Sequence, residues 1–237
     1  MAKRYVMLVD TLRCINCRAC VVACRAEWET PLGHSRNWVR EVEGMSDDGH
    51  PSVQLFSGRC QHCDEPACID ACPAGAAWKR EDGIVLVDQA LCSGCELCVP
   101  ACPYEARWLN PQTGTISKCT FCQPRVDEGL APACVQTCVG GALSFGDAND
   151  PDSEVSRLLA EKPWVQLTTA EVPGATSHYY HTGGRPLPRE VLPRPVGRQA
   201  QAAVLAEVGH PGAKAGIGGM LALLVAAGLT TGIARRT

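Results

Sequence analysis

The segment Cys92-Ser-Gly-Cys95-Glu-Leu-Cys98-Val-Pro-Ala-Cys102-Pro103 decides the fold of this chain. Its cysteines follow the spacing C-x2-C-x2-C-x3-C, which puts three thiols in one short loop and a fourth about one helical turn further on. The whole chain has 237 residues and 16 cysteines in four groups of four: the first and third have this spacing, the second has two more residues before its third cysteine, and in the last group eleven residues separate the second cysteine from the third. The groups are Cys14, Cys17, Cys20 and Cys24; Cys60, Cys63, Cys68 and Cys72; Cys92, Cys95, Cys98 and Cys102; and Cys119, Cys122, Cys134 and Cys138.

This spacing is typical of cysteines that bind 4Fe-4S clusters in bacterial ferredoxins. The short loop wraps one face of the cluster, and in two-cluster ferredoxins the fourth cysteine binds the neighbouring cluster. Prolines that suit a first helical turn follow Cys72 and Cys102, which favours pairing the second group with the third. By elimination the first group then pairs with the last, and sequential pairing is the alternative. The sequence predicts four 4Fe-4S clusters.

Two other uses of the cysteines compete with this prediction. Disulfides would require an oxidising, usually small secreted scaffold, and they would not follow this spacing. Structural zinc is the stronger alternative for the last group, because C-x2-C followed by C-x3-C forms a four-cysteine zinc site in other proteins. Three clusters plus one zinc is therefore an alternative, and so is a zinc-stabilised interaction module without redox activity.

An internal repeat predicts the fold class. Apolar runs at Tyr5–Asp10, Val53–Phe56 and Ile84–Asp88 each precede a cysteine group and are predicted as strands. Each strand leads into a cluster loop and a short helical turn. We therefore expect an α+β fold, a duplicated bacterial ferredoxin-like domain. Aromatic residues make up only 5% of the chain, and metal–ligand bonds would compensate for the small core.

The net charge does not point to nucleic acid as a partner, and basic residues near the cysteines could interact with the clusters. The formal net charge of -3 gives no indication of nucleic-acid binding. Basic residues near the cysteines would offset anionic clusters or form a solvated basic face. They are Arg13, Arg18, Arg25, Arg59, Lys79, Arg80 and Lys118.

Three regions are expected along the chain. Residues 1–165 form the four-cluster domain, with an insertion at 27–57 that is either a contact surface or a hairpin with Trp38 in a minor core. A helix is predicted at Glu154–Glu161, capped by Asp152 or Ser153. Residues 166–212 are a Pro/Gly-rich linker or partner-contacting tail.

A transmembrane helix is predicted at residues 213–235. Residues 215–234 carry no charge and are as long as the roughly 20 residues needed to cross a membrane. The protein is therefore expected to be anchored in the cell membrane by its C-terminal end. The first strand begins within five residues of Met1, which leaves no room for a leader peptide. The cluster domain is then either cytoplasmic or exported with a partner, and the flanking charges leave the orientation open.

Several further segments carry a family resemblance. The four groups are accompanied by Cys102-Pro-Tyr-Glu-Ala-Arg107, Lys118-Cys-Thr-Phe-Cys122, Pro132-Ala-Cys-Val-Gln-Thr-Cys138 and Phe145-Gly-Asp147. Over about residues 4 to 160 the chain resembles the iron–sulfur electron-transfer B subunits of the molybdopterin oxidoreductase family, the polysulfide, tetrathionate and dimethyl sulfoxide reductase types. The C-terminal tail departs from the polysulfide and dimethyl sulfoxide types and is more similar to the anchors of formate dehydrogenase or hydrogenase-linked B subunits.

The resemblance implies a set of four ligands for each cluster. The first set is Cys14, Cys17, Cys20 and Cys138; the second is Cys119, Cys122, Cys134 and Cys24; the third is Cys60, Cys63, Cys68 and Cys102; the fourth is Cys92, Cys95, Cys98 and Cys72.

The resemblance also implies the partners. They are a catalytic subunit with a bis-molybdopterin guanine dinucleotide centre and a polysulfide reductase-type membrane subunit that binds quinone. No catalytic residues are recognised on this chain. We expect a non-catalytic subunit that relays single electrons between these partners. The alternative is a membrane-anchored polyferredoxin that serves a hydrogenase or another enzyme without molybdenum.

Overall fold

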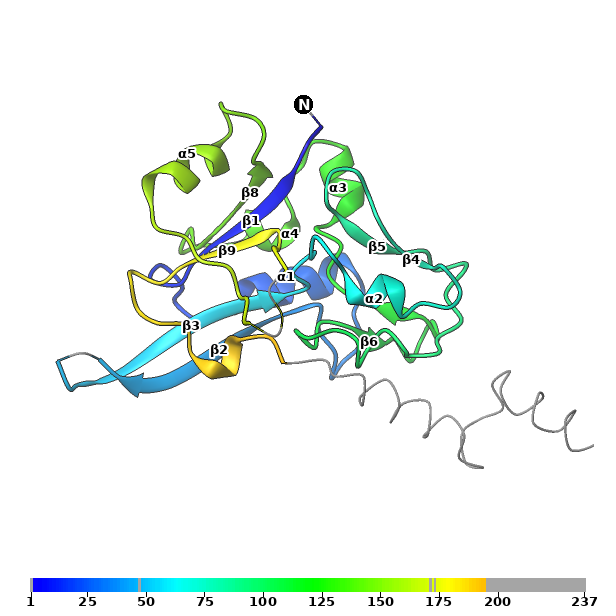
Figure 1. Ribbon diagram of the computed structural model, residues 1–237, viewed down its shortest axis with the longest axis horizontal. Helices are drawn as coiled ribbons and strands as arrows, with labels where there is room; N and C mark the ends of the chain where they lie inside the picture. Colours follow the sequence, from blue (N-terminus) through cyan, green and yellow to red (C-terminus); the bar gives the residue numbers. More distant parts are fainter. Residues whose placement is uncertain (1, 47, 171, 173, 195–237) are drawn as a thin grey trace, which may run out of the picture. The chain divides into compact units, whose positions relative to one another are not determined.

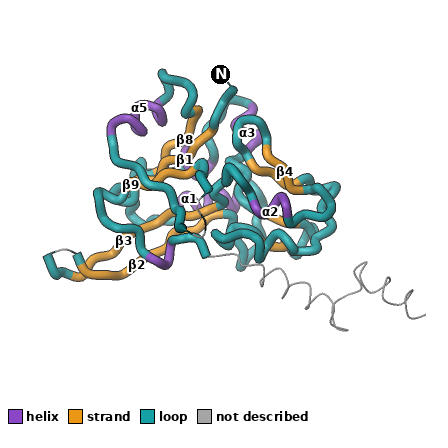
Figure 2. Tube along the Cα trace, viewed as in Figure 1, coloured by secondary structure: helices purple, strands orange, loops and turns teal. Residues whose placement is uncertain are grey.

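The computed structural model describes residues 2–46, 48–170, 172 and 174–194 (Figure 1). Short helices and strands alternate with long loops, and the loops make up much of the folded body (Figure 2). The strands are β1 (Tyr5–Asp10), β2 (Asn37–Met45), β3 (Pro51–Arg59), β4 (Ala77–Lys79), β5 (Val85–Val87), β6 (Trp108–Leu109), β7 (Ile116–Ser117), β8 (Leu143–Asp147) and β9 (His178–His181). The helices are α1 (Ala19–Glu27), α2 (Ala67–Asp70), α3 (Gln123–Asp127), α4 (Ala133–Gln136), α5 (Glu154–Glu161) and the 3-10 turn η1 (Arg189–Val191).

Strand β1 lies at the centre of a three-stranded sheet with the order β8-β1-β9. It pairs antiparallel with β8 and parallel with β9. Because side chains alternate along a strand, β1 packs against two different layers. Val6 and Leu8 pack with Val155 of α5, whereas Met7 and Val9 belong to the core that contains many of the cysteines. The predicted strand at Tyr5–Asp10 and the helix at Glu154–Glu161 have the expected bounds, and the Ser153 hydroxyl caps the helix.

Three antiparallel hairpins complete the sheet structure: β2-β3, β4-β5 and β6-β7. The first contains most of the expected insertion, so this segment forms a hairpin. Trp38 packs against the main core instead of forming a minor core. Gly58 pairs with Trp38 across the hairpin, and a Cβ atom at Gly58 would lie 2.3 Å from the indole nitrogen. A glycine is therefore required where the indole crosses β3.

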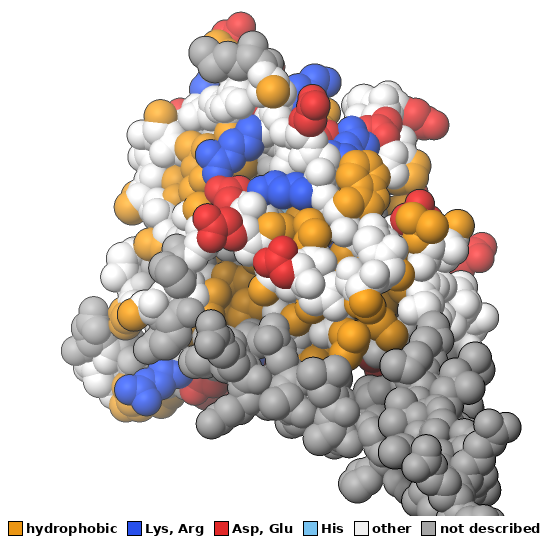
Figure 3. All heavy atoms as spheres, turned by 45° about the vertical axis from the view of Figure 1, so that its right-hand side comes forward, with side chains coloured by type: hydrophobic (Ala, Val, Ile, Leu, Met, Phe, Trp, Pro, Cys, Tyr) orange, Lys and Arg blue, Asp and Glu red, His pale blue; other side chains and the backbone are white. Residues whose placement is uncertain are grey.

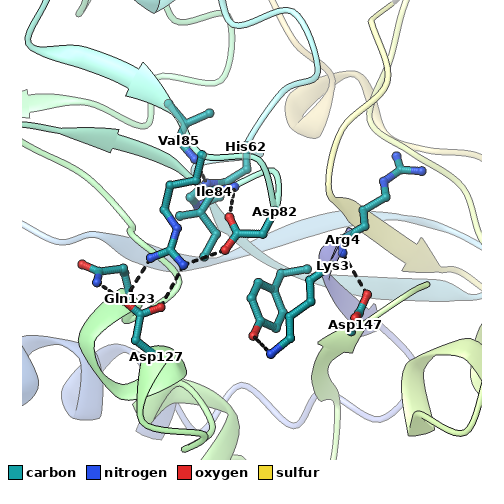
Figure 4. A network of polar contacts seen from close by, with 11 residues as sticks. Lys3, Arg4, His62, Asp82, Ile84, Val85, Gln123, Asp127 and Asp147 are labelled. Atoms are coloured by element: carbon teal, nitrogen blue, oxygen red, sulfur yellow. Dashed lines mark hydrogen bonds and ion pairs between the residues drawn. The ribbon is translucent and has the colours of Figure 1, made fainter. Parts of the chain in front are cut away.

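A polar network joins the β4-β5 hairpin to α3 (Figure 4). Arg80 binds both carboxylate oxygens of Asp127 at 3.0 and 2.9 Å and also contacts Asp82 at 2.7 Å. In the same view the amide of Val85 donates a hydrogen bond of 2.9 Å to Nδ1 of His62. These contacts fix the hairpin relative to the loops that carry the second and last cysteine groups.

The helical turns expected after the prolines are not present. Pro73 and Pro103 open turns that lead into strands β4 and β6. The short helices begin earlier in the cysteine groups instead. Helices α1, α2 and α4 contain the third cysteine of their groups, which is Cys20, Cys68 and Cys134, respectively. Proline suits a turn as well as a first helical turn, so the Cys-Pro pairs did not distinguish the two.

Part of the expected linker at residues 166–212 belongs to the folded body. Strand β9 fills the open edge of β1, and His178 and Tyr180 have no solvent-exposed surface. The compact unit runs to Pro195, about thirty residues past the expected boundary at 165. Backbone pairing with β1 stabilises this strand, although its sequence, His-Tyr-Tyr-His, has no aliphatic residue.

The predicted membrane span at residues 213–235 lies outside the described residues. In the described part of the chain, no helix has both the length and the apolar character that a membrane span needs.

Candidate functional site: four sets of cysteines

The fold brings the 16 cysteines together as four sets of four, each drawn from two of the sequence groups. Sets A, B and D each line one small cavity. In set C, Cys63 interacts electrostatically with the other three cysteines. Set A is Cys14, Cys17, Cys20 and Cys138; set B is Cys24, Cys119, Cys122 and Cys134; set C is Cys60, Cys63, Cys68 and Cys102; set D is Cys72, Cys92, Cys95 and Cys98.

All four C-x2-C loops share one backbone feature. The residue before the second cysteine has a left-handed conformation, with φ between 46° and 69°. A non-glycine residue pays about 1–2 kcal/mol for this conformation, so it persists only where the surrounding structure requires it. These residues are Asn16, His62, Gly94 and Phe121. The repetition of a strained turn in four different sequences indicates that the loops perform the same task.

Backbone and side-chain N–H groups point at several of the cysteine sulfurs. The amides of Ala106 and Ala142 donate to Cys102 and Cys138 at 3.4 and 3.2 Å, and each alanine lies four residues after its cysteine. Both alanines are buried, and their amides face the sulfurs. The indole of Trp28 donates to Cys122 at 3.4 Å. Such donors stabilise sulfur in its anionic, metal-bound form.

Burial disfavours ionisation of the thiols in the metal-free chain. It raises the pKa of Cys68 and of Cys119 to about 12, and neighbouring thiols contribute to the increase. The pKa values of Cys24 and Cys63 are also raised, again mainly by burial. These thiols are therefore neutral at neutral pH, and metal binding must displace their protons.

Three fully buried cations lie among these thiols. Arg59, Lys118 and Arg107 are 0%, 2% and 3% exposed. The Arg107 guanidinium faces the thiol of Cys98, and within the described residues none of its nitrogens has an oxygen acceptor. A buried cation beside neutral thiols is an uncompensated charge, which costs several kcal/mol. Iron binding converts the thiols to thiolates, and the resulting anionic cluster supplies the opposite charge. The donor sets and the buried cations together fit 4Fe-4S clusters.

The sets form a row with two accessible ends. Neighbouring sets lie close together in the order A–B–C–D: Cys20 lies near Cys134, Cys60 lies near Cys119, and Cys68 of set C belongs to the same buried cluster as Cys98 of set D. All members of set B are buried, and set C contains no exposed cysteine. Sets A and D at the ends of the row each have one exposed cysteine, Cys17 and Cys95. Sets A and D therefore meet the surface, while sets B and C are enclosed.

Residues other than cysteine are also buried near these sets. His62 is fully buried, its ring stacks on Phe121 with 3.9 Å between ring centroids, and its Nδ1 accepts a hydrogen bond from the amide of Val85. Burial also holds the pKa of His62 well below its usual range. Sequence reasoning named Arg59 and Lys118 but missed Arg107. No group of three or more His, Cys, Asp or Glu residues in the described chain is arranged to hold a single metal ion.

Known proteins with the same sequence pattern support this chemistry. Two family models described as 4Fe-4S dicluster domains match residues 13–76 and 51–148. The B subunit of tetrathionate reductase from Salmonella typhimurium is 42% identical over 181 residues, which cover 76% of this chain and 72% of that protein. Thiosulfate reductase electron transfer subunit PhsB of Salmonella typhi is 41% identical over 181 residues, covering 76% and 93%. Protein NrfC of Escherichia coli K12 is 43% identical over 169 residues, covering 70% and 76%.

Proposed function

The chain belongs to the family of iron–sulfur electron-transfer subunits of reductase complexes, and from this premise we propose a specific route for the electrons. The chain itself is a non-catalytic subunit of an oxidoreductase complex. We propose that it holds four 4Fe-4S clusters and relays single electrons between a quinone-reactive membrane subunit and a molybdopterin-containing catalytic subunit.

The row of four cysteine sets carries this proposal. A bound 4Fe-4S cluster supplies one-electron oxidation and reduction. The chain supplies four thiols for each cluster, amide donors toward their sulfurs, and a fold that excludes water from the middle of the row. Because sets B and C have no exposed cysteine, electrons would enter and leave through sets A and D.

The surface around both ends suits contact with other subunits. Ile15 and Val139, next to the cysteines of set A, are 63% and 74% exposed. At the other end Leu91, which precedes Cys92, is 57% exposed. Apolar side chains exposed beside a redox centre favour a partner that covers them and brings its own centre close. We propose that the catalytic and membrane subunits each dock at one of these ends.

Anchoring by residues 213–235 is a further part of the proposal. Its support is the uncharged sequence of residues 215–234. Membrane fractions extracted with carbonate would retain the full chain, and a variant ending after residue 212 would be released unless the partners alone hold it. Retention of the shortened chain when it is expressed without partners would contradict the anchor.

Metal analysis of the purified complex tests the central claim. Four cubanes require about 16 iron and 16 acid-labile sulfide atoms per chain, and three clusters with one zinc would give about 12 of each. A zinc-stabilised module would contain zinc and neither iron nor sulfide. Molybdenum in the co-purified catalytic subunit supports the proposed partner, and its absence beside full iron loading would favour the hydrogenase-type alternative.

A further inference from the structure

Each junction in the row of cysteine sets contains one fully buried cation. Arg59 lines the cavity of set B and donates to the sulfur of Cys134 at 3.7 Å, and Arg107 lines the cavity of set D. Each cation also lies near thiols of two neighbouring sets: Arg59 near sets A and B, Lys118 near sets B and C, and Arg107 near sets C and D. These thiols include Cys20 and Cys134 for Arg59, Cys119 and Cys60 for Lys118, and Cys68 and Cys98 for Arg107.

The internal repeat shows that packing does not require a charge at position 107. Arg107 lies five residues after the fourth cysteine of its group, and the equivalent residues in two other groups are Ala77 and Leu143. All three are buried, with 4% or 5% exposure for the apolar pair and 3% for the arginine. The same buried site thus accepts an apolar side chain elsewhere in this fold. A guanidinium there costs desolvation energy that an aliphatic residue would not.

A second comparison concerns the residue that precedes each group. Arg59 and Lys118 precede groups whose first cysteines belong to the enclosed sets C and B, and both are buried. Arg13 and Leu91 precede the groups that begin the two end sets, and both are exposed. Lys118 also donates hydrogen bonds to the carbonyl oxygens of Val85 and Cys119, which fix its ammonium group in place. Buried charge is therefore concentrated inside the row.

A buried cation favours the reduced state of a nearby cluster. Reduction adds one negative charge, and the Coulomb energy between that charge and a cation is large where water is excluded. A cation between two clusters acts on both, so it raises both reduction potentials together. An exposed cation at the same distance is screened by water and salt and has much less effect.

We propose that Arg59, Lys118 and Arg107 are electrostatic bridges, each of which raises the reduction potentials of the two clusters that flank it. This inference rests on the proposed function, because it presupposes four clusters.

The test is a potentiometric titration of the whole complex, followed by paramagnetic resonance, for Arg59→Leu, Lys118→Met and Arg107→Leu. Each substitution is expected to move two of the four reduction steps to lower potential. The steps moved by Arg59→Leu and Arg107→Leu should be different pairs, and Lys118→Met should move one step from each pair. This overlap pattern can be read without assigning any signal to a cluster. Arg107→Leu is well suited to fold, because Leu143 occupies the equivalent site.

Two controls separate charge from position. Arg18 lies inside the first cysteine loop with a side chain that is 58% exposed, so Arg18→Gln should leave the four steps close to their original potentials. Arg36 interacts with the thiols of Cys24, Cys119 and Cys122, all in set B. Arg36→Gln should therefore move one step and not two.

The variant Arg107→Lys retains the positive charge, so all four reduction steps should stay near their original potentials. Equal shifts in the Lys and Leu variants would show that shape matters and would overturn the proposal, as would unchanged potentials in Arg107→Leu at full iron content. If Arg107→Leu loses iron, retention of all iron by Arg107→Lys supports the charge requirement, and equal loss overturns it. Fewer than four steps in the unmodified complex would instead contradict the proposed function.

Discussion

Cys72 and Cys102 show how single residues connect the sequence groups. Each comes four residues after the third cysteine of its own group, but its thiol faces the set built by the other group. Cys72 lines the cavity of set D with Cys92, and Cys102 interacts with Cys60 and Cys63 of set C. A helical turn or equivalent loop between the third and fourth cysteine turns the last thiol away from its own loop.

Substitution of either residue should therefore affect the cluster of the other group. In Cys72→Ser the cluster held by Cys92, Cys95 and Cys98 should be lost or changed, because serine is a poorer iron ligand than a thiolate. Cys102→Ser is the matched variant and should change the cluster held by Cys60, Cys63 and Cys68. Paramagnetic resonance of the reduced complexes measures both. If Cys72→Ser altered only the signal that Cys102→Ser is expected to alter, the exchanged sets would be wrong.

Residue spacing indicated the four cysteine groups, and the family resemblance implied which cysteines share a cluster, but neither indicated the residues between and around them. Asn16 and His62 are of types that adopt the left-handed conformation more often than most, whereas Phe121 is not, so residue type alone did not identify a turn common to all the loops. Arg107 was missed for a different reason. Its signal was a charged residue at a repeat position that otherwise holds Ala77 or Leu143, which becomes visible only when the repeats are aligned by their fourth cysteines.

At the scale of elements, strands that carry their own apolar pattern were predictable, and the strand that depends on its neighbour was not. Strand β1 is an apolar run buried on both faces, and its bounds matched. Strand β9 contains only histidine and tyrosine, but it completes the pairing of β1. A surrounding segment rich in proline and glycine indicated a linker, because the pairing partner lies about 170 residues away in sequence.

Substitution of Tyr180 tests how much β9 contributes to the stability of the fold. Its ring is fully buried beside Phe56, its hydroxyl accepts a hydrogen bond from Gln61 at 3.0 Å, and its backbone pairs with Val165. Removing a buried aromatic side chain typically costs about 3–5 kcal/mol. Tyr180→Ala should therefore lower the thermal midpoint of the iron-loaded chain strongly, as measured by circular dichroism.

The adjacent tyrosine provides the control for this prediction. Tyr179 is only partly buried and faces the α5 side of the sheet, so Tyr179→Ala should lower the midpoint by less. Equal midpoints for Tyr180→Ala and the unmodified chain would mean that β9 is dispensable and that the linker interpretation was closer to the truth.

At the scale of the molecule, surface charge does not indicate where partners bind. The solvent exposure of the cysteine sets at the two ends of the row does. On the face shown in Figure 3, basic and acidic side chains lie next to one another, in keeping with the net charge of -3. Specificity for a partner would then depend on the apolar residues beside the exposed ends of the row and not on a surface potential that is mainly positive or mainly negative. The ends differ from the middle in solvent access, and this difference has a measurable consequence.

Oxidative loss of iron should begin at the ends of the row. Water and oxidants reach a cluster through exposed ligands, and the exposed cysteines are Cys17 of set A and Cys95 of set D. When the isolated, iron-loaded chain is exposed to ferricyanide and samples are reduced again before measurement, two of the four resonance signals should be lost first, and the signals of the enclosed sets B and C should persist longer. Partners that cover the ends should slow this fast phase in the complete complex. Decay of all four signals at one rate would show that exposure of the end cysteines does not control access, and equal rates with and without partners would show that the partners dock elsewhere.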